Sequence, residues 1–281
     1  MPCTCRTAFD VSENFVAAGE KRGGPQTVQG IQGELIMYVT TIGVFDGVHL
    51  GHKALLKEVN RLAQERNLRS RAFVVSHPFE HLTGDFDGLI TSHERRILLL
   101  SQYLDEVELL DLRCIKDMLA QEFFERILAK DTSVLVVGRD FKFGKNALGD
   151  LNLLKELCED RNITLRTFPD VLDENKERIS SSRIRDMIRD GKIEQAERLL
   201  GHEYLLEAVV LNVSSFNSKS VALLHTAKEL VRPQSGVFQI EEQNLKIRGT
   251  LILNGETKLV SQELRLAPGT YLYLRLMGGR S

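Results

Sequence analysis

Short apolar runs alternate with longer amphipathic stretches between residues 38 and 168, and this alternation most limits the fold. The runs YVTTIGVF, RAFVVS, EVELLD, SVLVVG and ITLRTF are short and mostly apolar, and they predict buried strands. The stretches between them have helical periodicity, as where Leu55, Val59 and Leu62 share one face of HKALLKEVNRLAQERN. The alternation predicts an α/β fold with a parallel sheet covered by helices on both faces.

Two of the predicted helices carry more detailed expectations. Thr91 stands three residues before Glu94, which is the spacing of a capping box and predicts a helix start at Thr91. The stretch KDMLAQEFFERILAK predicts a single helix with Leu119, Phe123 and Ile127 on its buried face.

The pattern changes on either side of this α/β region. Residues 1–36 lack a sustained period, and we expect a poorly ordered N-terminal extension with Met37 as a candidate biological start. Two short helices are predicted at about 181–190 and 193–200. From residue 204 to 281 strands alternate with turns, including an Asn-Gly hairpin signal, so a small all-β domain is expected there.

Composition excludes several classes of partner. The formal net charge of -2 gives no global basic field for nucleic acid. No apolar run reaches the roughly 18 residues that a membrane span needs. The four scattered cysteines are typical of a reduced intracellular protein rather than a disulfide framework. We expect a cytoplasmic protein whose partners are neither nucleic acid nor membrane.

The stretch GVFDGVHLGH carries two histidines at the predicted start of a helix. Gly47 permits a tight bend, and Gly51 leaves room for a ligand to approach the helix start. Free N–H groups and the helix dipole favour phosphate there. His49 and His52 would face the same side and donate to phosphoryl oxygens. A metal site would need further ligands that the neighbourhood does not supply, and a purely structural turn is the other alternative.

A second stretch, RISSSRIR, enters a predicted helix. Ser181 and Ser182 are candidates to cap that helix and to donate hydroxyl protons to a phosphate. Arg178, Arg183 and Arg185 add positive charge with the fork geometry that suits phosphate. The alternative is an ordinary capped helix with solvated arginines.

Two further loops follow predicted strands, where ligands of open α/β sheets bind. In VVGRDFKFGKNALGD, Phe141 and Phe143 are candidates to stack on a flat ring, and Asp140 to accept from a ring N–H or ribose hydroxyl. Packing of both phenylalanines beneath the loop is the alternative. SHPFEH places His77 and Pro78 at another strand end.

Taken in order, these motifs resemble the bacterial FAD synthetase family of bifunctional riboflavin kinases and FMN adenylyltransferases. The resemblance covers about residues 38–206, including the junction stretch GKIEQAERLLGHEY. It implies a Rossmann-like nucleotidyltransferase domain over 37–187, a connecting helix over 188–203 and a barrel-like β domain over 204–281. It also implies Mg²⁺-dependent transfer of AMP from ATP to FMN, giving FAD and pyrophosphate.

The resemblance further implies a role for each motif residue. Three residues would act in catalysis, namely His49, His52 and Arg185. The ATP site would comprise Gly43, Phe45, Asp46, Gly47, Gly51, Arg178, Ser181 and Ser182. The flavin or adenine would lie near His77, Pro78, Asp140, Phe141 and Phe143.

The C-terminal part departs from the family. Its riboflavin kinase motif, a Gly-rich run followed by Gly-Phe-Pro-Thr-Ala-Asn, survives here only as Thr226 and Ala227. Leu223, His225 and Lys228 replace the glycine, the proline and the metal-side asparagine. Side chains in place of glycine would block phosphate approach, and a lysine cannot ligate Mg²⁺. The acidic catalytic segment and C-terminal helix of the family are not recognised either, so we expect no kinase activity.

Two other functions remain open from the sequence. Ser76-His77-Pro78 stands where the family shows Phe-Asp-Pro-His-Pro, so a related nucleotidyltransferase with another phosphate acceptor is one alternative. The altered second domain also allows a non-catalytic protein that binds flavin or nucleotide.

Overall fold

The computed structural model describes residues 36–280 apart from 85, 217–218, 243 and 263. The N-terminal extension expected over residues 1–36 therefore lies outside the described residues, apart from Ile36. The described chain forms two compact units. The sheet unit comprises the described residues up to Gly43, Leu56–Ser76 and Tyr103–Phe168, and the barrel unit comprises Val44–Leu55, His77–Gln102 and the described residues from Pro169 onward.

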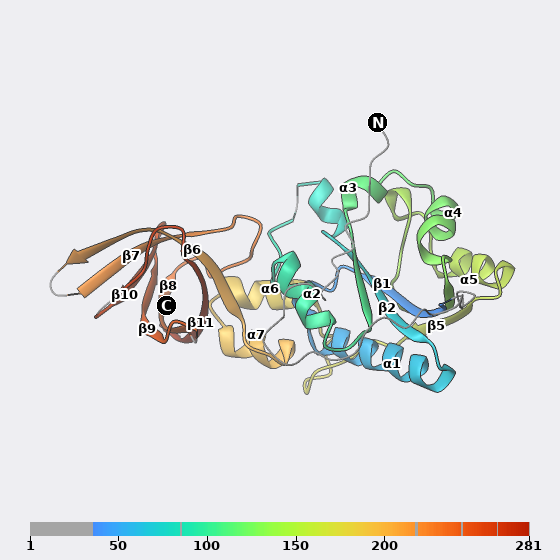
Figure 1. The fold of residues 1–281 in the computed structure, drawn as a ribbon, viewed down its shortest axis with the longest axis horizontal. Helices are drawn as coiled ribbons and strands as arrows, with labels where there is room; N and C mark the ends of the chain where they lie inside the picture. The colour runs from blue at the N-terminus through green and yellow to red at the C-terminus, as the bar shows by residue number, and fades with distance from the viewer. Residues whose placement is uncertain (1–35, 85, 217–218, 243, 263, 281) are drawn as a thin grey trace, which may run out of the picture. The chain divides into compact units, whose positions relative to one another are not determined.

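The sheet unit contains a five-stranded parallel sheet, which confirms the predicted α/β fold (Figure 1). Its order is β3-β2-β1-β4-β5. The strands are β1 (Tyr38–Gly43), β2 (Arg69–Val75), β3 (Glu106–Leu110), β4 (Thr132–Gly138) and β5 (Thr164–Phe168). The central residues of β4, 134–137, are all buried, as expected for a strand covered on both faces.

Helices and a shared apolar core stabilise this sheet. The helical segments are α1 (Leu50–Arg66), α3 (Leu112–Ile115), α4 (Ala120–Phe123), η4 (Phe124–Leu128), η5 (Lys145–Ala147) and α5 (Leu151–Asp160). Phe73 of β2, Phe124 of η4 and Leu154 of α5 belong to one buried cluster. Helix α1 begins in the barrel unit and continues into the sheet unit.

The single helix predicted over KDMLAQEFFERILAK is wrong in its details. Helix α4 begins only after Leu119, which is extended and 64 % exposed. The chain then widens into a π-helical turn, η4, at Phe124. The wider turn allows the adjacent side chains of Phe123 and Phe124 both to enter the core, which explains why the regular helical register is lost.

The helix α2 (His93–Leu100) corrects the expected capping box. Ser92, not Thr91, is its N-cap, and the Ser92 hydroxyl accepts a hydrogen bond of 3.3 Å from the Arg95 N–H. The Thr91 side chain is buried instead. The start of the helix is therefore set one residue later than the spacing to Glu94 predicts.

The barrel unit contains a closed antiparallel barrel, which confirms the expected β domain (Figure 1). Its order is β10-β7-β6-β11-β8-β9. The strands are β6 (Leu205–Phe216), β7 (Lys219–Thr226), β8 (Gly236–Glu242), β9 (Ile247–Leu253), β10 (Thr257–Ser261) and β11 (Tyr271–Arg280). The turn at Asn254-Gly255 joins the antiparallel pair β9 and β10, as predicted.

The interior of the barrel is continuous with two helices, α6 (Ser181–Arg189) and α7 (Ile193–Leu200). Ile188 of α6 and Leu200 of α7 share one buried cluster with Phe238 of β8 and Leu272 of β11. Two short helical turns, η2 (Asp46–Val48) and η3 (Phe79–Leu82), complete the unit. Among the described residues, no helix combines the length and apolar character needed to cross a bilayer.

Two glycines of one hairpin test the packing of the barrel. A Cβ at Gly249 in β9 would lie 2.6 Å from the Val260 carbonyl oxygen of β10, whereas a Cβ at Gly255 would meet open space. We expect Gly249→Ala to lower the free energy of unfolding by about 1–3 kcal/mol, because it pushes two paired strands apart. Gly255→Ala adds only the strain of its positive φ, about 1 kcal/mol. Urea unfolding measures both, and equal losses would contradict the packing described.

Candidate functional site

The loop after β1 makes a sharp turn that directs the first residues of α1. Phe45 and Gly47 both have positive φ, at 51° and 74°. A Cβ at Gly47 would lie 2.9 Å from side-chain atoms of both Ile90 and Leu200, so glycine is required there. His202 Nε2 lies 2.8 Å from the Gly47 carbonyl oxygen, so this contact also holds the turn.

His49 and His52 lie together at the start of α1, as the sequence predicts. Their rings stack with centroids 3.6 Å apart, and the His52 backbone N–H donates to His49 Nδ1 at 3.3 Å. An accepting Nδ1 places the proton of a neutral His49 ring on Nε2. A Cβ at Gly51 would lie 3.0 Å from the His49 ring, so this glycine also makes room for that imidazole.

Both imidazoles are held in the neutral form. Burial, and then the charge of Arg178, lowers the pKa of His49 to about 4. Burial also lowers the pKa of His52 well below its usual range, and His49, Arg96 and Arg178 add to that effect. The Phe45 ring meets His52 edge-on, with centroids 5.3 Å apart. Neutral imidazoles remain able to donate N–H hydrogen bonds to an anion.

Asp46 joins the two predicted phosphate motifs. Its carboxylate is buried and accepts from the Ile90 N–H at 2.7 Å and from Arg185 at 2.8 Å. The Ser181 hydroxyl donates to the Asp46 carbonyl oxygen at 2.9 Å. Burial raises the pKa of Asp46, while the charge of Arg185 and the Ile90 N–H oppose that rise. The structure therefore brings Asp46, Ser181 and Arg185 into direct contact.

The other residues of RISSSRIR divide between the site and local structure. Arg185 also donates to the Ser182 hydroxyl at 3.2 Å. Arg178 is exposed and lies 3.0 Å from Asp170. Arg183 pairs with Asp173 at 2.6 Å, which makes it part of the local structure rather than a free cation.

The expected cap of α6 is also corrected. Ser180 is the N-cap, with its hydroxyl accepting from the Arg183 N–H at 3.4 Å. Ser181 and Ser182 lie inside the helix, because the extended backbone that a cap requires occurs one residue earlier.

His77 and Pro78 belong to the barrel unit, where His77 is part of an aromatic cluster. The His77 ring stacks on His81 with centroids 4.1 Å apart and meets His93 edge-on at 4.9 Å. Burial, followed by the charges of His81 and His93, lowers the pKa of His77 to about 4. Phe86 contacts this cluster and also lies beneath the Arg185 guanidinium, 5.2 Å from it.

Asp140, Phe141 and Phe143 belong to the sheet unit, together with Gly43. Phe143 is buried, stacks on Phe141 with centroids 5.6 Å apart and contacts the core through Phe123. Its side chain packs beneath its own loop, as the structural alternative holds. Phe141 is half-buried and Asp140 is exposed, so these two keep surface for a ligand.

Sequence reasoning missed Arg96, which is fully buried near the turn. Its guanidinium donates to the Val44 carbonyl oxygen at 2.6 Å, and its charge acts on both Asp46 and His52. Burial lowers the pKa of Arg96 to about 10. An arginine on the apolar face of HERRILLL was the available signal, since arginine is almost never fully buried without a partner.

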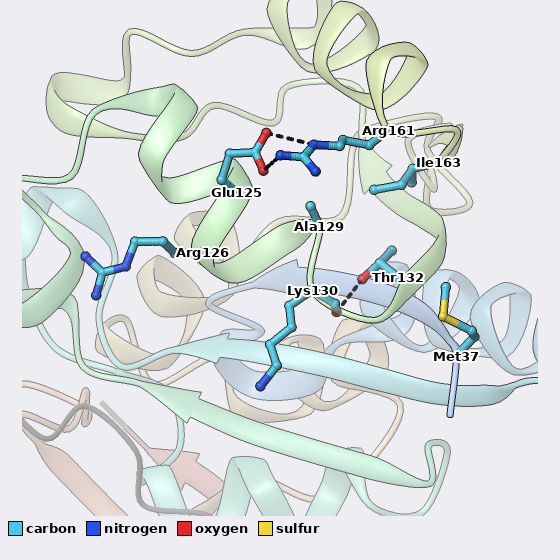
Figure 2. A pocket seen from close by; sticks show the side chains of 8 residues that line it. All are labelled: Met37, Glu125, Arg126, Ala129, Lys130, Thr132, Arg161 and Ile163. Carbon is cyan, nitrogen blue, oxygen red and sulfur yellow. Dashed lines mark hydrogen bonds and ion pairs between the residues drawn. The ribbon is translucent and has the colours of Figure 1, made fainter. Parts of the chain in front are cut away.

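A pocket of about 370 Å³ in the sheet unit contains none of the expected site residues (Figure 2). Met37, Thr132 and Ile163 place it at the amino ends of β1, β4 and β5. Gly43 and Asp140 lie at the opposite, carboxyl ends of β1 and β4. Arg161, one of its cations, is paired with Glu125. Over the described residues, no group of three histidine, cysteine or acidic side chains is arranged to hold a metal.

The chain combines a parallel α/β sheet with a closed antiparallel barrel, and its two stacked imidazoles lie at a helix start. The FAD synthetase family model matches residues 32–183, which is more than half of the chain. An FAD synthetase of Listeria monocytogenes is 32 % identical over 181 residues, covering 62 % of this chain and 72 % of that protein. The chain belongs to the FAD synthetase family and is a nucleotidyltransferase.

Other similar proteins cover different shares of their own length. A bifunctional riboflavin kinase/FMN adenylyltransferase of Escherichia coli K12 is 30 % identical over 218 residues, covering 72 % of this chain and 67 % of that protein. One from Buchnera aphidicola is 29 % identical, and the match spans 59 % of that protein and 64 % of this chain. A crystal structure from Streptococcus pneumoniae, described as a macrolide-efflux protein, superposes with a TM-score of 0.70 at 25 % identity, covering 87 % of this chain and 94 % of that one.

The lowered pKa of His49 predicts a specific loss of stability in acid. An unfolded histidine titrates near 6.5, whereas folded His49 takes a proton only near pH 4. The unfolded chain therefore binds more protons between these values, and stability falls as pH drops through them. Between pH 7 and pH 5, we expect the free energy of unfolding of His49→Gln to fall by about 2 kcal/mol less than that of the unchanged protein. Urea unfolding at both pH values measures this.

The exposed His225 supplies the matched control. His225→Gln is expected to follow the unchanged protein at both pH values. A His49→Gln variant with the same pH dependence as the control would contradict a buried, neutral His49.

Proposed function

We propose that the protein transfers the AMP group of ATP to the phosphate of FMN, giving FAD and pyrophosphate. The observation that carries this proposal is the contact between Asp46 and Arg185, which joins the loop of His49 and His52 to the start of α6. Family membership supports FMN as the acceptor, because the relatives carry that activity in their names.

In this reaction an oxygen of the FMN phosphate attacks the α-phosphorus of ATP. The bond from the α-phosphorus to the bridging oxygen breaks, and pyrophosphate leaves with that electron pair. The FMN phosphate is already a competent nucleophile, so no covalent intermediate on the protein is needed. Positioning and stabilisation of charge are then the main contributions of the protein.

The neutral histidines suit this task. His49 would donate from Nε2 to a phosphoryl oxygen, since its Nδ1 accepts the His52 N–H. His52 would add a second donor as charge moves to the equatorial oxygens. Arg185, with Arg178 and Ser182, would bind the β- and γ-phosphates. Ser181 would act by holding the loop, because its hydroxyl donates to the Asp46 carbonyl.

Mg²⁺ is proposed to arrive with ATP rather than as a resident ion. The donor set of the site is made of imidazoles, N–H groups and arginines, which do not fit a hard cation. The buried Asp46 carboxylate already accepts from Ile90 and Arg185. The phosphate oxygens of ATP and water would therefore be the ligands of Mg²⁺.

We also propose that riboflavin kinase activity is lost. Leu223 lies within β7 and is paired on both sides, with Lys258 of β10 and Asn212 of β6. The described strands of the barrel bury an aliphatic cluster with Phe238, and they also bury Thr226, Glu242 and Thr257. A paired strand with a side chain at this position leaves no Gly-rich loop to approach a phosphate.

ATP and flavin nucleotides are metabolites of the cytoplasm, and we propose a cytoplasmic location for this enzyme. The near-neutral charge supports small-molecule substrates rather than nucleic acid as its partners.

The direct test is incubation with Mg-ATP and either FMN or riboflavin, with products separated by chromatography. We expect FAD from FMN, and neither FMN nor FAD from riboflavin. Absence of FAD would refute the proposed acceptor, and a screen of other phosphate acceptors would then be the next measurement. FMN made from riboflavin would refute only the loss of the kinase.

Replacement of His52 tests the proposed stabilisation of charge. We expect His52→Ala to lower kcat by about 10² or more with a smaller change in KM for ATP, because the donor acts mainly in the transition state. His225→Ala, at an exposed histidine of the barrel, is the control and should keep the original kcat. Unchanged turnover in His52→Ala would remove this residue from the mechanism.

A further inference from the structure

The segment 227–232, which follows β7, docks along residues 88–90 of the barrel unit. The Leu89 N–H donates to the Glu229 carbonyl at 2.6 Å, and the Val231 N–H donates to the Leu89 carbonyl at 2.8 Å. These two bonds form an isolated parallel bridge between Leu89 and Leu230. Leu89 and Val231 are both buried, so the contact is shielded from water. We call residues 227–232 the strap.

The strap is itself fixed to the barrel. The buried Tyr204 hydroxyl donates to the Val231 carbonyl at 2.6 Å. Arg232 donates to the Thr257 hydroxyl of β10 at 3.1 Å. Val231 also belongs to the apolar cluster that includes the interior of the barrel. Contacts with the barrel therefore fix the position of the strap.

Ile90, the residue after Leu89, contacts the candidate site directly. Ile90 donates its N–H to one oxygen of Asp46 at 2.7 Å, and Arg185 binds the other oxygen at 2.8 Å. The Ile90 side chain also fills the space beside Gly47, where a Cβ would lie only 2.9 Å away. A shift of Ile90 would therefore disturb both the turn and the carboxylate that holds Arg185.

We propose that the strap is a positioning element of the nucleotide site, acting through Leu89, Ile90 and Asp46 on Arg185. The contacts run without interruption from the barrel to the guanidinium proposed to bind ATP phosphates. Ile90 and Arg185 both donate to this buried carboxylate, and losing one donor from a buried acceptor costs free energy. A displaced strap would therefore change how Asp46 holds Arg185 and weaken the contact of Arg185 with phosphate. This inference rests on the proposed role of the site in binding ATP.

Two glycines of the same segment provide a matched test. Both have positive φ, 108° at Gly88 and 85° at Gly84. A Cβ at Gly88 would lie 3.0 Å from both the Glu229 carbonyl oxygen and the Val231 nitrogen, whereas a Cβ at Gly84 would meet nothing within 4 Å. Gly88→Ala therefore pushes on the strap, and Gly84→Ala adds a similar backbone strain without that contact.

The readout is the Kd of Mg-ATP by calorimetry on the full chain, with folding of each variant checked by circular dichroism. We expect Gly88→Ala to raise this Kd about fivefold or more and Gly84→Ala to leave it unchanged. Tyr204→Phe, which removes only the hydroxyl that holds the strap, should shift the Kd in the same direction. If Gly88→Ala fails to fold, the Kd of Tyr204→Phe alone tests whether the strap affects Mg-ATP binding.

Combination with Arg185→Lys separates positioning from a general loss of stability. If the strap acts through Arg185, adding Gly88→Ala to Arg185→Lys should cost less affinity than it costs alone. Additive losses, or unchanged Mg-ATP binding in folded Gly88→Ala and Tyr204→Phe, would overturn the proposal. Synthesis of FAD by the unchanged protein is scored separately, so failure of the proposed reaction is not confused with failure of the strap.

Discussion

The buried ion pair between Asp46 and Arg185 is the interaction on which the rest of the site depends. Taking a carboxylate out of water costs several kcal/mol unless a cation and further donors replace the solvent. Asp46 has both, in Arg185 and the Ile90 N–H. Because Asp46 lies in the turn that precedes α1, the same pair that satisfies the carboxylate also fixes where the histidines stand.

The electrostatic character of the site follows from burial beside arginines. Burial, and after it the charges of His49, Arg96 and Arg178, lowers the pKa of His52. Protonating the two imidazoles would add a third and a fourth positive charge beside Arg96 and Arg178. That would cost free energy, so the imidazoles remain neutral donors. The arginines supply positive charge, and the neutral histidines supply N–H donors. Together they form an environment suited to the phosphates of a nucleotide.

The barrel contributes to this site through packing. Helix α6, which carries Ser181 and Arg185, shares its apolar cluster with the barrel strands. The loop of Asp46 and the segment of Ile90 belong to the same compact unit. Removing the barrel would expose the apolar face of α6 and leave Ser181 and Arg185 without that support.

Local patterns in the sequence determined the parallel α/β sheet, the β domain, the Asn254-Gly255 hairpin and the pairing of His49 with His52. Each of these depends on residues close together in the chain, where period and spacing encode backbone geometry. The tertiary structure alone decided that Asp46 meets Arg185, 139 residues away, that Arg96 is buried and that Phe143 packs beneath its loop. It also moved two helix caps by one residue, to Ser92 and Ser180. These outcomes depend on which distant groups share a buried space, and no spacing within a single segment records that.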